Sequence, residues 1–238
     1  MVFKEYFYVG YSDINHALLL SNTAILRYFE NIACMHGSLA GDGFATSSAV
    51  WFLTGYRVNV HKRPAFEERL FGETWSRDMK GYVSSREFAL YAADGSLAVT
   101  ALSNWARIDR ATGRPVRLTE ELAERYGTEK DRGNFEKPWL DRLCECETYE
   151  SERDFFIDRN FIDANLHMNN IHYLEVAGLV LPEELYVNEP TAFDIRYRKA
   201  VTYGETVKCL YGKNEDGSTV TMKSADGNET RAIVRFYH

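Results

Sequence analysis

The residue types that can act on an acyl carbonyl are gathered in one octad, Asp163-Ala164-Asn165-Leu166-His167-Met168-Asn169-Asn170. A carboxylate can serve as nucleophile or general base, and an imidazole can move protons near neutral pH. On an extended segment successive side chains alternate, so Asp163, Asn165 and His167 are expected to point to one side. Such a row suits thioester hydrolysis, in which water or the carbonyl is activated and an oxyanion develops.

A helix is expected to begin where the octad ends. Asn169 or Asn170 can cap it, the segment runs to about Val180, and Pro182 stops it. The first turn of a helix leaves backbone N–H groups without intrahelical partners and carries partial positive charge. We therefore expect the backbone near Asn169 and Asn170 to polarise the substrate carbonyl. The alternative is a purely structural role, in which these two residues are only caps.

The octad belongs to the second of two similar halves. Gly72-Glu73-Thr74 recurs as Gly204-Glu205-Thr206 (204 − 72 = 132). Ala93-Asp94-Gly95 recurs as Ala225-Asp226-Gly227 (225 − 93 = 132), and each copy lies between two strand-like runs, as a hairpin turn does. Two identical tripeptides at one offset predict that one fold is repeated.

Each half is predicted to hold one helix and several long antiparallel strands. In the first half, apolar residues recur at helical spacing from Ile25 to His36, with Ser21 or Asn22 as the cap and Gly37 as the end. The run from Val50 to Val60 alternates, which indicates a strand with one buried face. A sheet of such strands wrapped around one helix is the hot-dog arrangement.

The predicted fold is therefore α+β, with two tandem hot-dog domains. The N-terminal domain is expected at residues 1–126 and the C-terminal domain, which carries the octad, at 148–238. The segment 127–147 is expected to be a linker. Its mixed charge run, from Glu129 to Lys137, is interpreted as a solvated stretch, and a short helix from Thr119 to Tyr126 precedes it.

Composition excludes several classes of protein. The formal net charge of −7 argues against nucleic-acid binding, which normally needs a basic surplus. No apolar run reaches the ~20 residues of a membrane span, and the first residues lack a signal peptide's apolar stretch, so a cytoplasmic location is expected. The cysteines form neither a disulfide framework nor a zinc pattern and are expected to be free thiols: Cys34, Cys144, Cys146 and Cys209.

The pattern Asp-x-Asn-x-His-x-Asn-Asn, followed by Tyr173, resembles the active-site motif of the acyl-ACP thioesterases of plants and bacteria. Pieces of the first half are similar to that family's first hot-dog domain and occur in the same order, so the resemblance covers nearly the whole chain. They are Gly55-Tyr56-Arg57-Val58, Arg63-Pro64, Gly72-Glu73-Thr74-Trp75 and Ser103-Asn104-Trp105.

The resemblance implies that Asp163, Asn165 and His167 are the catalytic groups and that the first domain shapes the acyl pocket. It implies hydrolysis of fatty acyl-ACP to free fatty acid and ACP, which terminates fatty-acid synthesis, without metal or cofactor. The partner is then an acyl carrier protein. The chain shows no plastid transit peptide, so a bacterial type is expected, as a monomer or homodimer.

One departure from the family concerns a further carboxylate. Plant members place a catalytic Glu after Tyr-Arg-Arg, but here the run is Tyr197-Arg198-Lys199-Ala200. Glu175, in the predicted helix, and Glu205 are candidates to replace it. Each also has an ordinary interpretation, Glu175 as a helix surface residue and Glu205 as the repeat partner of Glu73.

A basic group of residues is a candidate docking site for an acidic carrier protein, since only a local patch could attract it to an acidic chain. The alternative is a solvated face. The group comprises Arg57, Lys62, Arg63, Arg196 and Arg198.

Other activities stay open at this point. An acyl-CoA thioesterase would use the same site, a hot-dog hydratase or dehydratase would release no thiol, and a non-catalytic module would only bind acyl chains. A fainter echo of the octad, Asp13-Ile14-Asn15-His16, precedes the first helix and is interpreted as a decayed site.

Overall fold

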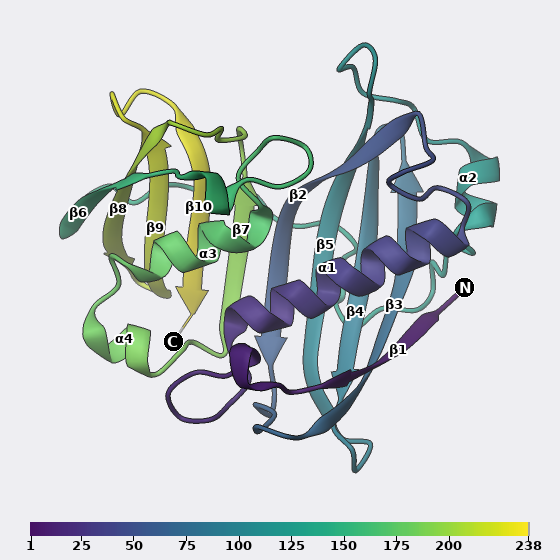
Figure 1. Ribbon diagram of the computed structural model, residues 1–238, viewed down its shortest axis with the longest axis horizontal. Coiled ribbons are helices and arrows are strands. Elements are labelled where there is room, and N and C mark those ends of the chain that lie inside the picture. The colour runs from purple at the N-terminus through teal and green to yellow at the C-terminus, as the bar shows by residue number, and fades with distance from the viewer. Residues whose placement is uncertain (238) are drawn as a thin grey trace. The chain divides into compact units, whose positions relative to one another are not determined.

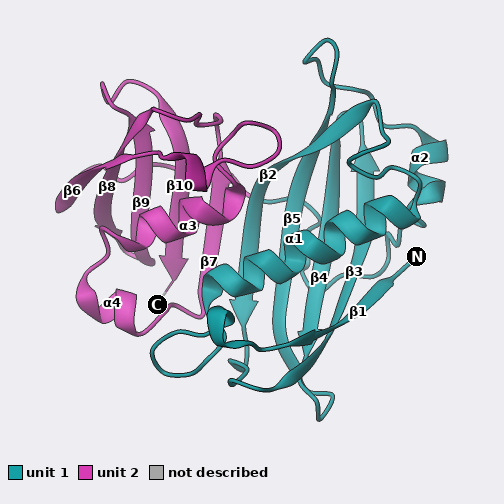
Figure 2. Ribbon diagram, viewed as in Figure 1, with its two compact units in different colours: residues 1–140 teal, residues 141–238 magenta. Residues whose placement is uncertain are grey.

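The computed structural model describes residues 1–237, and the chain divides into two compact units, Met1–Leu140 and Asp141–His238 (Figure 2). Within the described residues each unit holds five strands and one main helix that lies across them, α1 in unit 1 and α3 in unit 2 (Figure 1). Unit 1 contains β1 (Phe3–Tyr8), the 3-10 helix η1 (Tyr11–Asp13), α1 (Asn22–Leu39), β2 (Ala49–Val60), β3 (Arg69–Lys80), β4 (Val83–Tyr91), β5 (Leu97–Asp109) and α2 (Glu120–Arg125). Unit 2 contains β6 (Ser151–Phe156), the 3-10 helix η2 (Arg159–Phe161), α3 (Asn170–Gly178), α4 (Glu183–Val187), β7 (Ala192–Tyr197), β8 (Thr206–Asn214), β9 (Gly217–Ser224) and β10 (Thr230–Tyr237).

The strands follow the same order in both units. The hydrogen-bonded order is β1-β3-β4-β5-β2 in unit 1 and β6-β8-β9-β10-β7 in unit 2. Neighbouring strands within each unit are antiparallel. The prediction of an α+β fold built from two tandem hot-dog domains is confirmed. The short helix α4 was not expected from the sequence.

One of the two repeated tripeptides marks equivalent turns. Ala93-Asp94-Gly95 joins β4 to β5, and Ala225-Asp226-Gly227 joins β9 to β10. Each turn places its glycine at positive φ, 81° for Gly95 and 77° for Gly227, a conformation that glycine adopts at little cost. These turns therefore form a true structural repeat.

The other tripeptide does not mark equivalent positions. Gly72-Glu73-Thr74 lies within β3, whereas Gly204 and Glu205 lie in the loop before β8. Backbone N–H of Gly204 donates to the carbonyl of Ile157, and in unit 1 the matching bond runs from Glu67 to Val9. Glu205 therefore corresponds to Glu68 (205 − 68 = 137), and the prediction that Glu205 and Glu73 occupy equivalent positions in the two halves is wrong.

Both main helices begin at the predicted caps. The hydroxyl of Ser21 accepts from the N–H of Ala24 at 3.2 Å and starts α1, which continues to Leu39, two residues beyond the predicted end. Asn169 starts α3, with its side-chain oxygen 2.9 Å from the nitrogen of Ile171. Side chains of α1 pack against the sheet of unit 1, as when the ring of Phe29 meets that of Phe88 at 4.6 Å.

A β-bulge interrupts the predicted alternation in β2. The pairing with β5 shifts register between Leu53 and Gly55. Beyond the bulge Tyr56 and Val58 are buried as expected, but before it Leu53 is buried and Phe52 only partly so. The bulge inserts one residue and moves the side chains before it to the other face.

The charge run from Glu129 to Lys137 is not a freely solvated stretch. Arg132 pairs with Glu73 on β3 and covers the ring of Trp75 at 4.2 Å. Arg77 on β3 donates to the carbonyl of Phe135 at 2.7 Å. The sequence interpretation missed this packing because the partners lie about 60 positions away along the chain.

Candidate active site

The octad folds as a tight turn before α3. The backbone N–H of Asp163 donates to the carbonyl of His167 at 2.8 Å, and Ile162 and Met168 form an isolated β-bridge. Leu166 occupies the tip with φ of 62° and is 75% exposed. The expectation of an extended segment is therefore wrong, and alternation does not decide where the side chains of the octad point.

The carboxylate of Asp163 organises this turn. Its Oδ1 accepts from the backbone N–H of Asn165 at 2.8 Å and of His167 at 3.4 Å. Its Oδ2 lies 3.5 Å from the side-chain nitrogen of Asn165. A carboxylate that bonds the backbone two residues on forms an Asx turn. Asp163, Asn165 and His167 are each partly buried, so all three are brought together in a partly accessible turn.

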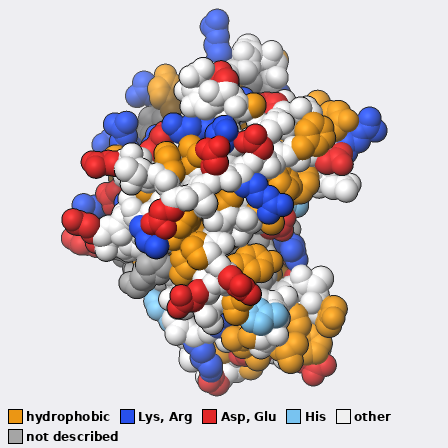
Figure 3. Space-filling view, turned by 90° about the vertical axis from the view of Figure 1, so that its left-hand side faces the viewer, with side chains coloured by type: hydrophobic (Ala, Val, Ile, Leu, Met, Phe, Trp, Pro, Cys, Tyr) orange, Lys and Arg blue, Asp and Glu red, His pale blue; other side chains and the backbone are white. Residues whose placement is uncertain are grey.

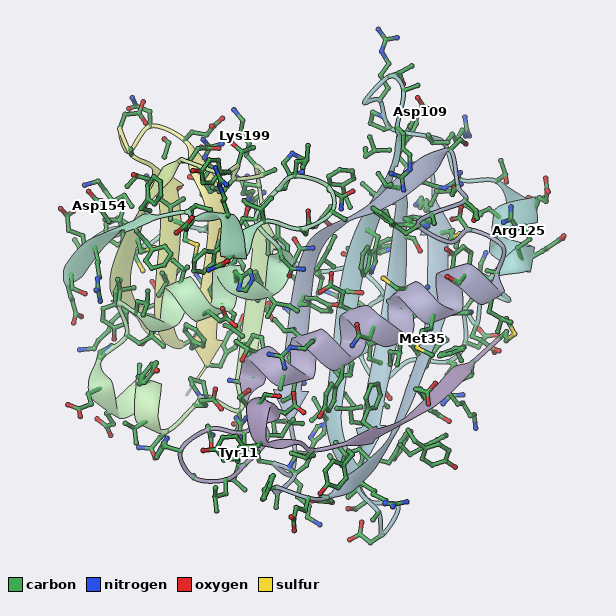
Figure 4. All side chains as sticks on the ribbon, in the orientation of Figure 1. Tyr11, Met35, Asp109, Arg125, Asp154 and Lys199 are labelled. Atoms are coloured by element: carbon green, nitrogen blue, oxygen red, sulfur yellow. The ribbon has the colours of Figure 1, made fainter. Side chains whose placement is uncertain are left out.

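Unit 1 contains the same turn at an offset of 148 (163 − 15 = 148). There the side-chain oxygen of Asn15 accepts from Ala17 at 3.0 Å and from Leu19 at 3.2 Å. Leu18 is at the tip with φ of 59°, and nearby Tyr11 is highly exposed (Figure 4). Asn15, and not Asp13, thus matches Asp163. The suggested echo is real in shape, but its predicted alignment is wrong by two residues.

A loop from β7 to β8 lies against the end of the turn. The carbonyl of Val201 accepts from the N–H of Met168 at 2.8 Å, and the N–H of Val201 donates to the hydroxyl of Tyr173 at 3.2 Å. Burial raises the pKa of Tyr173 to about 12, so its hydroxyl keeps its proton. The charges of Arg231, Glu205 and Asp163 all act on this hydroxyl.

The two candidate carboxylates have different surroundings. Glu175 lies on the exposed part of α3, and its Oε2 is 2.6 Å from Nδ1 of His172. Glu205 accepts from the N–H and the hydroxyl of Thr202, both at 2.8 Å, and pairs with Arg231. Glu205 is thus tied to the loop that touches the octad turn, whereas Glu175 is engaged by its own helix.

The side chain that follows Tyr197-Arg198-Lys199 is an exposed alanine, Ala200. Its carbonyl accepts from Nη1 of Arg231 at 3.2 Å. Arg231 lies on β10, 31 positions from Ala200, and belongs to no sequence motif. It was therefore not identified from the sequence.

The five predicted docking residues differ in how far their side chains are exposed to solvent. Arg196 is 7% exposed and donates to the carbonyl of Asp141 at 2.8 Å, so its burial contradicts a docking role. Arg63 donates to the carbonyl of Leu20 and to Asn22.

The other three docking residues differ in exposure. Arg57 is partly buried, whereas Lys62 and Arg198 are exposed. On the face drawn in Figure 3, acidic and basic side chains are interspersed, and they do not gather into one basic field.

Within residues 1–237, no three His, Cys, Asp or Glu side chains are placed to hold a metal ion. The helices of the same residues include none that is long and apolar enough to cross a membrane.

Family models match both units. Residues 1–126 match the acyl-ACP thioesterase N-terminal domain, and residues 146–236 match the acyl-ACP thioesterase C-terminal domain. The chain belongs to the acyl-ACP thioesterase family. The members of this family are thioester hydrolases, and the octad lies in the C-terminal domain.

Relatives of known name share the family. Oleoyl-acyl carrier protein thioesterase 2 of Arabidopsis thaliana, a chloroplast protein, is 22% identical over 252 residues, which cover 98% of this chain and 69% of the plant protein. Palmitoyl-acyl carrier protein thioesterase of Cuphea hookeriana is 22% identical over 236 residues and covers 91% of this chain and 56% of its own.

Solved structures of similar proteins share the fold. An acyl-ACP thioesterase from Bacteroides thetaiotaomicron superposes with a TM-score of 0.86 at 22% identity, covering 99% of this chain and 97% of its own. The 12:0-ACP thioesterase from Umbellularia californica superposes with a TM-score of 0.85 at 17% identity, covering 99% and 96%.

Proposed function

We propose that this protein hydrolyses the thioester of fatty acyl-ACP, releases free fatty acid and ACP, and so terminates fatty-acid synthesis. The observation that carries the proposal is the match of both units to the two acyl-ACP thioesterase domains. The relatives whose names give a substrate act on acyl groups attached to acyl carrier protein.

We assign the chemistry to the octad turn. Oδ2 of Asp163 makes the weaker contact of the two carboxylate oxygens and is the atom directed to reaction, since Oδ1 holds the backbone of the turn. Asp163 attacks the carbonyl or removes a proton from water, and Asn165 orients the water or carbonyl. His167 gives a proton to the departing thiolate, which balances the proton released by water.

The first turn of α3 receives the developing oxyanion. The side chain of Asn169 accepts from the N–H of Ile171, and the N–H of Asn169 donates to the carbonyl of Phe161, so the oxyanion is assigned to the N–H of Asn170. Donors placed where negative charge develops lower the barrier. Glu205 is the better of the two additional carboxylates because it is tied to the loop that bonds Met168.

The test is thiol release from acyl-ACPs of C8 to C18, with the matching CoA esters in parallel. We expect rapid release from acyl-ACP that depends on chain length and is lost in Asp163→Asn. Equal rates on CoA esters, with no gain from the carrier, would contradict the carrier assignment. Bound fatty acid without any turnover would contradict hydrolysis.

Label found in the Asp163 carboxylate after a single turnover in ¹⁸O-labelled water identifies attack by that carboxylate on the substrate. Direct attack by water puts the label into the first fatty acid released. Attack by the carboxylate forms an anhydride, and water that then attacks the Asp163 carbonyl puts the label into the enzyme.

Carrier docking is proposed for the exposed cations Lys62 and Arg198. Reversal of either charge is expected to raise KM for acyl-ACP most at low salt, because exposed charges are screened as salt rises. KM for a CoA ester is the internal control.

A further inference from the structure

The loop Ala200–Glu205 supports the octad turn from the side of the sheet. Val201 is fully buried, and its two backbone polar groups bond to Met168 of the octad and to Tyr173 of α3. A shift of this loop therefore moves both the end of the turn and the first turns of the helix. Whatever fixes the loop also fixes the place of Asp163 and His167.

The equivalent loop of unit 1, Arg63–Glu68, is held in place by one of its own side chains, that of Arg63. The carbonyl of Pro64 accepts from Leu20 at 2.8 Å, as that of Val201 accepts from Met168. Arg63 supplies a guanidinium that donates to the carbonyl of Leu20 at 2.8 Å and to the side-chain oxygen of Asn22 at 3.0 Å. Proline has no N–H to place, so unit 1 needs no counterpart of the bond from Val201 to Tyr173.

Backbone hydrogen bonds show which residues at the start of this loop occupy equivalent positions in the two units. In unit 1 the carbonyl of Ala98 accepts from His61 and Lys62. In unit 2 the carbonyl of Arg231 accepts from Arg198 and Lys199. Residues 98 and 231 thus occupy matching positions, and so do residues 63 and 200 (200 − 63 = 137).

In unit 2 the guanidinium comes from outside the loop, from Arg231 on β10. Arg231 is 8% exposed and donates to the carbonyl of Ala200 at 3.2 Å. It also pairs with Glu205 at the other end of the loop and with Glu229 at 3.1 Å. Its planar fork reaches both ends of the loop at once, which the single ammonium of lysine cannot do in the same geometry.

We infer that Arg231 is a positioning residue for thioester hydrolysis, acting through the Ala200–Glu205 loop on the Asp163–His167 turn. The inference rests on the proposed function. Unit 1 has the same turn without Asp, Asn and His at the three positions, and its loop is fixed without an arginine at position 98. The extra restraint thus occurs in the unit whose turn carries the groups suited to the reaction, where a displacement of about 1 Å can cost on the order of 100-fold in rate.

The test installs the unit 1 arrangement in unit 2 with Ala200→Arg, Val201→Pro and Arg231→Ala together. Because unit 1 folds with these residues, we expect the thermal midpoint to stay within a few degrees. We expect kcat on acyl-ACP to fall about 100-fold and KM to change less than about 3-fold, because the variant loses the bonds of the loop to Arg231 and to Tyr173, which unit 1 lacks and which hold the reacting groups in place.

Two single variants support the test if the triple variant unfolds. Arg231→Met removes the guanidinium and keeps the apolar stem, and it is expected to lower kcat about 30-fold with KM little changed. Arg231→Lys is expected to recover part of that loss. Wild-type kcat in folded Arg231→Met, or in the folded triple variant, would overturn the inference while leaving the proposed function intact. A wild-type protein that releases no thiol from any acyl-ACP would overturn the proposed function and this inference with it.

Discussion

The turns before α1 and α3 have one backbone geometry and two sets of side chains. Each is closed by the side chain of residue 15 or 163, each has leucine at positive φ at its tip, and each leads to a capped helix. Asn15, Ala17 and Leu19 in unit 1 correspond to Asp163, Asn165 and His167 in unit 2. The shape of the turn therefore belongs to the fold, and its chemistry depends on three side chains.

The comparison also separates two roles of Asp163. Asn15 accepts the same two kinds of backbone N–H with a neutral amide oxygen, so the turn does not require a negative charge. A charge that the fold does not need is a charge available for reaction. Substitution of each residue in unit 2 by its unit 1 counterpart thus removes chemistry with little change in the turn.

The largest effect is expected for Asp163→Asn, because it keeps the oxygen that closes the turn and removes the carboxylate. We expect kcat to fall about 1,000-fold or more, as loss of an acid–base or nucleophilic group does, with the thermal midpoint unchanged. Steady-state thiol release and thermal unfolding measure the two quantities. The reciprocal Asn15→Asp in unit 1 is the matched control and should leave kcat unchanged. Substantial activity in Asp163→Asn would show that the two turns do not differ in the way proposed.

His167→Leu is expected to have the next largest effect, since it installs the residue found at position 19. Loss of the group that protonates the thiolate should lower kcat about 100-fold or more. The loss should be smaller for an acyl thioester whose leaving thiol is more acidic, because such a thiolate needs less protonation. A pair of acyl esters that differ only in the thiol makes the measurement. An equal loss for both esters would contradict the proposed role.

A buried histidine in unit 1, His36, is expected to make the free energy of unfolding depend on pH. His36 is fully buried, its Nδ1 is 2.9 Å from Nη1 of Arg86, and burial together with that cation lowers the pKa of His36 to about 3. Between an unfolded pKa of about 6.5 and the folded value, only the unfolded chain binds the proton. Stability is therefore lost as pH falls below about 6.5, by about 1.4 kcal/mol per pH unit.

His36→Gln tests this dependence. Between pH 7 and pH 5 the wild type should lose about 2 kcal/mol more stability than the variant, as measured by urea unfolding at both pH values. Parallel losses in the two proteins would mean that His36 titrates normally in the folded state.

The smallest effect is expected at the exposed tip of the turn. Leu166 has φ of 62°, which costs a side-chain-bearing residue about 1–2 kcal/mol, while glycine loses about 0.5–1 kcal/mol of backbone freedom on folding. Leu166→Gly should raise the free energy of unfolding by about 0.5 kcal/mol, and Leu18→Gly should do the same in unit 1. Denaturant unfolding compares the two variants. A loss of stability in only one of them would reveal packing at that tip that the other lacks.

The sequence by itself determined the local signals of this protein. Asn169 and Ser21 cap their helices as predicted, Ala-Asp-Gly turns mark matching hairpins, and the pattern of the octad identified the family. These features depend on a few consecutive residues, whose backbone preferences and side-chain reach are short-range. The hot-dog topology followed because each half repeats such signals in the same order.

The tertiary structure decided what depends on distant partners. The octad bends into a turn because Oδ1 of Asp163 holds nearby N–H groups while the N–H of Met168 bonds to Val201, 33 positions away (201 − 168 = 33). The identical tripeptides at positions 72 and 204 proved inequivalent because strand pairing, and not sequence identity, sets register. Arg231 had no sequence signal, since a guanidinium that fixes a loop from another strand can be recognised only when both are placed in space.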